Sequence, residues 1–282
     1  MELPEKSTQY YWSLKKGYEG ELRFDSFTEK LECDRLQLND LLLKSGSTTY
    51  QIDSVLVTAE AILLYEVKNY DGDYYYDSKT DTFYKKPNHE ITNPLHQLSR
   101  SESLFRKQLE QLGYHLPIKA YLIFVNDSFT LYQAPLNKPI IYPTQIKKHF
   151  QQLNAVQKKL NRKLKHLAEK IVSLHISKSP FSQLPPYEYS QLKKGMICKT
   201  CHSLSTYTEG WNCICRTCNH EEKVETAVMR SVREFQLLFP ERKVTTSTIH
   251  DWCRVVESKR WIRNILNRNM KQVGRNRWAY YI

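Results

Sequence analysis

The hydrophobic and polar positions change their period near residue 34. Before it, apolar side chains recur at helical spacing, as Leu14, Tyr18 and Leu22 do, and predict a helix. Beyond it, apolar residues alternate with polar ones or form short continuous runs, which is typical of strands. The expected strands are 35–44, 50–58, 61–68, 74–76, 82–85, 118–125 and 139–142.

Helical spacing returns further along the chain. Asn93 and Pro94 suit the N-cap and first turn of a helix that ends before Gly113. Residues 144–176 predict a long amphipathic stretch with a break near 153–154, and the prolines and serines that follow indicate a linker. The last segment predicts helices at 224–239, 246–255 and 258–269, then a strand, a basic turn and a strand.

Charge divides the chain into two halves. Residues 1–150 carry 18 Lys and Arg against 20 Asp and Glu, whereas residues 151–282 carry 24 against 10. The basic half favours a polyanionic partner, and a solvated basic surface without a partner is the alternative. A hydrophobic content of 40% excludes a wholly disordered chain.

The apolar runs also bear on localisation. The longest strictly apolar run, 120–125, is too short to cross a bilayer, so no membrane partner is expected. The first residues show neither a basic n-region nor an apolar h-region of a signal peptide. We therefore expect a soluble, cytoplasmic protein.

Two of the expected strands carry charges among apolar neighbours. Glu66 and Lys68 are two residues apart, so their side chains leave the same face of a strand. If 50–58 and 61–68 pair as a hairpin, Asp53 lies opposite them. A divalent cation between the two carboxylates would remove their repulsion, and hard oxygen ligands suit Mg²⁺ or Mn²⁺. The alternative is that all three are ordinary charges near strand ends.

These residues belong to a longer resemblance. The stretches GYEGE (17–21), QID (51–53), YEVKNYDG (65–72) and NPLHQ (93–97) resemble, in this order, the NERD domain. NERD is a nuclease-related family assigned to the PD-(D/E)xK phosphodiesterase superfamily. One departure is Ser54, where many members place a histidine or another polar residue.

The resemblance implies roles for individual residues. It makes Asp53, Glu66 and Lys68 the active-site triplet, which Glu21 on the first helix and Gln97 on a later helix complete. Asp53, Glu66 and Glu21 would then bind the catalytic Mg²⁺ or Mn²⁺, and Lys68 would assist the attacking water or the phosphate. Without the resemblance, the sequence favours a solvent-facing helix residue for Glu21 and an exposed amide for Gln97.

Five of the seven cysteines fall within one short stretch. Two C-x2-C pairs, Cys198 with Cys201 and Cys215 with Cys218, are separated by thirteen residues and predict a structural zinc site with four thiolate ligands. Cys213 could replace Cys215, but the paired spacing favours Cys215. A redox pair or free thiols are the alternatives to zinc.

The segment after the cysteines resembles a winged helix-turn-helix, with the third helix as the reader of the major groove. Its cations would neutralise phosphates of DNA, and the alternative is a small helical domain with a protein partner. The candidate DNA-binding residues lie on the third helix and in the basic turn: Lys259, Arg260, Arg263, Arg268, Arg275 and Arg277.

The expected fold class is α/β (α+β), with a restriction-endonuclease-like mixed sheet flanked by helices, then a small zinc ribbon and a winged helix-turn-helix. The expected domains are a nuclease-like domain at 1–145, a helical segment and linker at 146–195, the zinc ribbon at 196–220 and the winged helix at 221–282. The expected function is metal-dependent hydrolysis of DNA phosphodiester bonds. The alternative is a non-catalytic DNA-binding regulatory protein that uses a nuclease-like scaffold.

Overall fold

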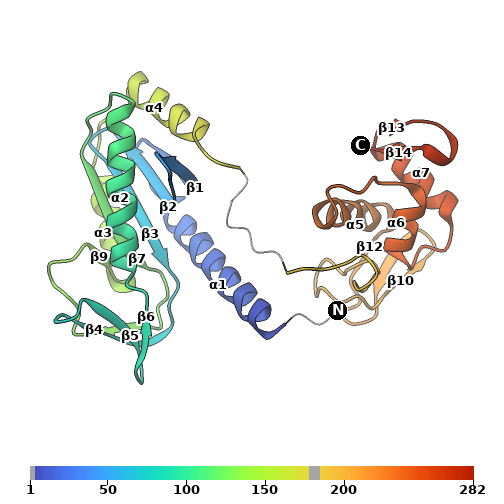
Figure 1. Cartoon of the computed structure of the whole chain (residues 1–282), viewed down its shortest axis with the longest axis horizontal. Coiled ribbons are helices and arrows are strands. Elements are labelled where there is room, and N and C mark those ends of the chain that lie inside the picture. The colour runs from blue at the N-terminus through green and yellow to red at the C-terminus, as the bar shows by residue number, and fades with distance from the viewer. Residues whose placement is uncertain (1–3, 178–184) are drawn as a thin grey trace. The chain divides into compact units, whose positions relative to one another are not determined.

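The computed structural model describes residues 4–177 and 185–282. The chain forms two compact units, one up to Pro185 and one from Pro186 onward (Figure 1). Both mix helices with sheets, as the sequence predicts. The N-terminal unit is built on two mixed sheets flanked by helices, and the C-terminal unit has a small antiparallel sheet followed by helices.

The main sheet of the N-terminal unit has five strands in the order β1-β2-β3-β7-β9. The first three pair antiparallel, whereas β7 lies parallel to β3 and β9 parallel to β7. The strands are β1 (Arg35–Ser45), β2 (Thr48–Thr58), β3 (Ile62–Lys68), β7 (Ile118–Phe124) and β9 (Ile140–Ile141).

A second sheet of four strands has the order β6-β5-β4-β8. Its strands are β4 (Gly72–Asp77), β5 (Thr82–Lys85), β6 (His89–Ile91) and β8 (Phe129–Tyr132). The ring of Phe124 at the end of β7 stacks on Phe129 of β8, with centroids 3.8 Å apart. The two sheets are thereby joined by one aromatic core.

Helices cover both faces of the main sheet. α1 (Glu5–Thr28) and α3 (Ile146–Asn154) pack through Phe24 and Phe150 against one face. α2 (Pro94–Gln111) and α4 (Arg162–Ser173) pack against the other, and Figure 1 shows α2 lying along that face. A short 3-10 turn, η1 (Pro143–Gln145), precedes α3.

Capping side chains set the helix boundaries. The Oδ1 atom of Asn93 accepts the N–H of Leu95 at 2.9 Å, and Pro94 is the first residue of α2, as the sequence predicts. The expected break after residue 153 is also present, because α3 ends at Asn154. α4 begins anew after Asn161, whose side chain accepts the N–H of Leu164 at 2.9 Å.

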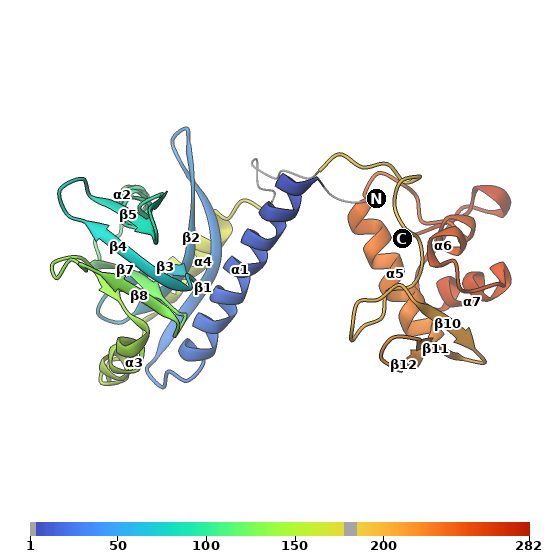
Figure 2. The same cartoon turned by 90° about the horizontal axis from the view of Figure 1, so that it is seen from below.

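The C-terminal unit has its own apolar core. The first part of the unit is a three-stranded sheet, which Figure 2 shows beside α5. Its strands are β10 (Thr206–Glu209), β11 (Asn212–Cys215) and β12 (Glu221–Lys223). The second part is α5 (Val224–Leu238), α6 (Thr246–Cys253), α7 (Lys259–Asn269), β13 (Gln272–Val273), η2 (Asn276–Trp278) and β14 (Tyr280–Tyr281). Val244, between α5 and α6, forms an antiparallel bridge with Tyr281, which adds a third segment to the terminal hairpin.

Among the described residues, no helix combines the length and the apolar character that crossing a bilayer requires.

One glycine determines how closely α1 approaches the sheet. A Cβ atom at Gly20 would lie 2.6 Å from the Cβ of Asn69, which follows β3. The Nδ2 of Asn69 donates to the carbonyl of Lys16 at 2.9 Å, and its Oδ1 accepts from Asn126 at 3.1 Å. Asn69 therefore ties α1 to the ends of β3 and β7, and this contact needs a residue without a side chain at position 20.

We expect Gly20→Ala to lower the free energy of unfolding by about 1–3 kcal/mol, because Asn69 must move away from the added methyl group. Gly17→Ala is the matched control, since nothing lies within 4 Å of a Cβ there and alanine favours the helix by roughly 1 kcal/mol. Urea denaturation followed by circular dichroism measures both. A similar effect of the two substitutions would contradict this account of the contact.

Candidate functional site

The antiparallel pairing of β2 and β3 ends where the candidate site begins. The last paired residues are Ser54 and Tyr65, so Asp53 and Glu66 are the next residues on the two strands. Beyond the last backbone pair, the side chain of Asp53 still contacts β3, because its Oδ2 accepts the N–H of Val67 at 2.8 Å. This hydrogen bond fixes the carboxylate of Asp53 against β3.

Glu66 and Lys68 meet on one face of β3. The Nζ of Lys68 donates to the Oε1 of Glu66 at 2.6 Å and to the Oε1 of Gln97, on α2, at 3.3 Å. Only 2% of the Glu66 side chain and 20% of the Lys68 side chain are exposed. The structure therefore brings together the four residues that the sequence selects from β2, β3 and α2.

Burial and like charge shape the titration of the carboxyl groups. Burial, with the negative charge of Asp53, raises the pKa of Glu66 to about 7 although Lys68 acts in the opposite direction. Burial likewise raises the pKa of Asp53, against the effects of Lys68 and of the Val67 N–H. Burial alone would lower the pKa of Lys68, but Glu66 and Asp53 outweigh it and the pKa is raised. Holding both carboxylates ionised near neutral pH therefore costs free energy.

Glu21, on α1, lies at the edge of this group. Its side chain is half-buried, and burial raises its pKa to about 7, with the charges of Asp53 and Asp40 acting in the same direction. The close contact of Gly20 with Asn69 places this part of α1 next to the end of β3.

The donor atoms of Asp53 and Glu66 suit a hard divalent cation. Within the described residues, each of the two carboxylates keeps one oxygen that accepts no hydrogen bond. Carboxylate oxygens are the ligands that Mg²⁺ and Mn²⁺ prefer, and a cation would offset the burial and the like charge that raise these pKa values. Asp53 and Glu66 are thus the residues that could hold such an ion.

One charged neighbour of the site was not among the residues predicted from the sequence. Asp40, on β1, is exposed and has a left-handed backbone with φ of 49°, and the pairing of β1 with β2 skips Asp40 and Asp53. Its charge raises the pKa values of Glu21 and Asp53. The signal was the polar pair Asn39-Asp40, which interrupts the alternation of apolar residues that Leu36 and Leu38 begin.

The second site is the four-cysteine cluster. Among the described residues, Cys198, Cys201, Cys215 and Cys218 are the group of three or more candidate metal ligands whose atoms lie within 4.8 Å of one another. Glu21, Asp53 and Glu66 do not form such a group.

The cluster has the geometry of a tetrahedral thiolate site. The Sγ atoms of Cys198 and Cys218 are 3.6 Å apart and those of Cys201 and Cys215 are 3.5 Å apart. Zn–S bonds of about 2.3 Å separate tetrahedral sulfur ligands by roughly 3.8 Å, so the four sulfurs fit zinc. The N–H groups of Thr200 and Thr217 each donate to a cysteine sulfur, at 3.4 Å in both loops.

Cys213 is not part of this cluster. It is buried on β11, two residues before Cys215, and its side chain belongs to the apolar core of the C-terminal unit. The cluster therefore contains Cys215 and not Cys213.

The candidate DNA-binding residues lie on the surface of the C-terminal unit. Lys259, Arg260, Arg263 and Arg268 are exposed on α7, and Arg268 forms an ion pair with Glu225 at 3.8 Å. Arg275 is exposed between β13 and β14, whereas the side chain of Arg277 lies outside the described part of the structure.

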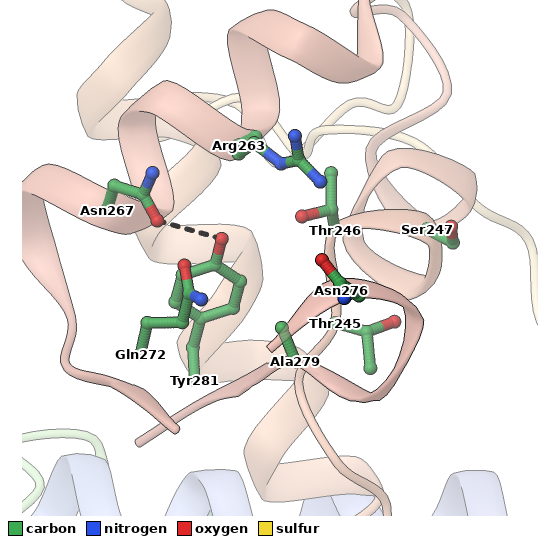
Figure 3. Close-up of a pocket in the computed structure, with 9 residues that line it drawn as sticks. All are labelled: Thr245, Thr246, Ser247, Arg263, Asn267, Gln272, Asn276, Ala279 and Tyr281. Atoms are coloured by element: carbon green, nitrogen blue, oxygen red, sulfur yellow. Dashed lines mark hydrogen bonds between the residues drawn. The ribbon is translucent and has the colours of Figure 1, made fainter. Parts of the chain in front are cut away.

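A polar cavity of about 510 Å³ lies among α6, α7 and the terminal hairpin (Figure 3). Figure 3 shows the guanidinium of Arg263 extending toward Thr246 at the start of α6. On its other side, the hydroxyl of Tyr281 donates to the Oδ1 of Asn267 at 2.9 Å.

We expect one zinc ion per chain in the purified protein, bound by the four clustered cysteines. Cys201→Ser should release the zinc and unfold the small sheet, because a structural metal site supplies much of the stability of such a module. Cys213→Ala is the control and should keep the metal. Elemental analysis with circular dichroism measures both, and zinc loss from the control alone would refute the assignment of ligands.

Comparison with known proteins identifies one part of the chain. No curated protein and no solved structure shows detectable similarity to the chain. A protein family does match, over a segment that contains Glu21, Asp53, Glu66, Lys68 and Gln97. Residues 16–125 are a NERD, nuclease-related domain.

Proposed function

We propose that the protein is a nuclease that hydrolyses DNA phosphodiester bonds with Mg²⁺ or Mn²⁺. One observation carries the proposal: within a nuclease-related domain, Asp53, Glu66 and Lys68 converge at the end of one strand pair. Burying charge is costly and an apolar residue would serve a scaffold better, so the charged group favours catalysis over the non-catalytic alternative.

The residues would divide the work as follows. Asp53 and Glu66 would hold the cation. Glu21 from α1, whose carboxylate does not group with theirs within 4.8 Å, would have to shift toward the ion to serve as a third ligand. The bound ion would supply a water of lowered pKa and would offset negative charge on the phosphate. Lys68, which Glu66 and Gln97 hold in place, would stabilise charge that develops on the phosphate oxygens.

The topology supports a restriction-endonuclease-like assignment for the N-terminal unit. Its antiparallel strands β1–β3 continue into the parallel strand β7 across a chain crossover that contains α2, and helices cover both faces. The site lies where β3 ends, and the side chain of Lys68 keeps 20% of its surface exposed there, so a phosphate group would reach the site through Lys68.

We infer that the C-terminal unit delivers the nuclease to DNA. Three helices are followed by a hairpin that Val244 extends to three segments, which is the order of a winged helix-turn-helix. α7 carries four basic residues and no acidic one, and Arg263 borders a cavity lined by the Thr245, Thr246 and Ser247 side chains. The small cysteine-bearing sheet corresponds to a zinc ribbon.

The catalytic proposal predicts that Glu66→Gln and Lys68→Met each reduce DNA cleavage at least about a hundredfold, since each removes a charge that acts on the phosphate or on the cation. The assay follows nicking of plasmid and degradation of linear DNA with Mg²⁺ or Mn²⁺. Glu110→Gln, exposed on α2, is the matched control and should cleave like the wild type. Equal cleavage by wild type and both site variants, or none by any of them, would defeat the proposal.

The targeting proposal predicts that the double charge reversal Arg260→Glu with Arg263→Glu weakens binding to duplex DNA and makes it less dependent on salt, because fewer counterions are released. Arg233→Glu on α5 changes an exposed charge elsewhere in the same unit and is the control. Fluorescence anisotropy over a salt series measures the affinity and its slope. An unchanged slope in the double variant would rule out α7 as the DNA-binding helix.

A further inference from the structure

Two tryptophan rings meet between the small sheet and α7. Trp211 occupies the turn between β10 and β11, and Trp261 lies on the first turn of α7. Their ring centroids are 5.5 Å apart and their planes are nearly perpendicular, at 86°. Trp261 is half-buried against the core, whereas Trp211 is 73% exposed and is not among the residues that pack against that core.

The turn that carries Trp211 is anchored on both sides. The carbonyl of Trp211 accepts the N–H of Val224, where α5 begins, at 2.9 Å. The hydroxyl of Thr208 on β10 donates to the carbonyl of Val255, in the loop before α7, at 3.0 Å. The exposed indole is therefore held on a fixed backbone, so a ligand that stacks on it does not have to order this turn.

A hollow of about 390 Å³ lies against the two rings. Its other walls come from Gly210, Ser258, Arg260 and Asn264. This volume falls within the range of roughly 300–1,000 Å³ that small-molecule sites occupy. The exposed side chains of Arg260 and Asn264 make no hydrogen bond or ion pair within the described residues, so a cation, an amide donor and an amide acceptor are free at its rim.

We propose that this hollow, the Trp211 platform, binds one unstacked nucleobase, and that the nucleic acid partner therefore contains a single-stranded segment. The proposal rests on the proposed nucleic-acid binding by α7. A base in a duplex has both faces covered by its neighbours, whereas a base in a single strand can stack on an aromatic side chain.

The surrounding charge favours a nucleic acid over a peptide. Residues 185–282 contain 17 Lys and Arg against 9 Asp and Glu, and Lys259, Arg260 and Arg263 lie on the same helix as Trp261. These cations would contact phosphates on either side of the stacked base. An uncharged peptide could pack against the tryptophan rings but would not interact with the basic side chains. The tryptophan rings together with the basic side chains therefore favour a base that is linked to phosphates.

The test compares binding of the full-length protein to a labelled single strand, to the duplex of the same sequence and to a strand of abasic sugar-phosphates, at one salt concentration and without divalent cations. We expect Trp211→Ala to weaken binding to the single strand roughly 5- to 150-fold, the effect of losing one stacked base. Binding to the duplex and to the abasic strand should not change. Trp211→Phe, which keeps a ring, should restore most of the affinity.

Leu237→Ala is the matched control, because Leu237 is an 81% exposed apolar residue of α5 in the same unit. It should bind all three probes as the wild type does, and thermal unfolding should show every variant folded. The proposal is overturned if Trp211→Ala binds the single strand normally, or if it loses the three probes equally. In either case, the DNA-targeting proposal would still stand if the variant with Arg260→Glu and Arg263→Glu loses binding to the duplex. Failure of the wild type to bind any probe would overturn both proposals.

Discussion

The buried hydrogen bond between Lys68 and Glu66 is the constraint on which the N-terminal unit depends. A carboxylate at 2% exposure is tolerated only where a partner offsets the loss of hydration, and Lys68 is that partner. Gln97 and the backbone of Val67 complete the arrangement, the first by accepting from Lys68 and the second by fixing Asp53. Two strands and one helix must keep their register for these bonds to form together.

The C-terminal unit is stabilised in a different way from the N-terminal unit. Its three short strands, β10–β12, bury little apolar surface, so they rely on four thiolates held by two equivalent loops. The helices α5–α7, in contrast, form an ordinary apolar core around Phe235 and Trp252. The cysteine cluster and this core meet through β11, which carries Cys215 in the cluster and Cys213 in the core.

Local rules were sufficient to predict most of the elements and part of the candidate site. Alternation and apolar runs indicated β1–β3 and β7, and capping residues such as Asn93 placed α2 within a residue or two. The strands β6 and β8 were not predicted, because they are short and their polar residues resemble those of loops. The two-residue spacing of Glu66 and Lys68 predicted that they share a face, since this depends on strand geometry alone.

The position of Glu21 could not be derived in this way, because it depends on how α1 docks on the sheet. The same holds for Asp40, whose effect on the carboxyl groups arises from an irregular point in the pairing of β1 and β2. The Trp211 platform is likewise a tertiary feature, since Ser258 follows Trp211 by 47 positions and Arg260 follows it by 49. Such sites require contacts between segments whose local patterns carry no information about each other.

The absence of a side chain at residue 20 affects how a glycine at this position is interpreted when related chains are compared. A glycine within a long helix is usually taken as a weak point or a hinge, yet this one is the flat surface on which an asparagine rests. Relatives that keep a small residue here would be preserving a distance between helix and sheet rather than freedom of movement.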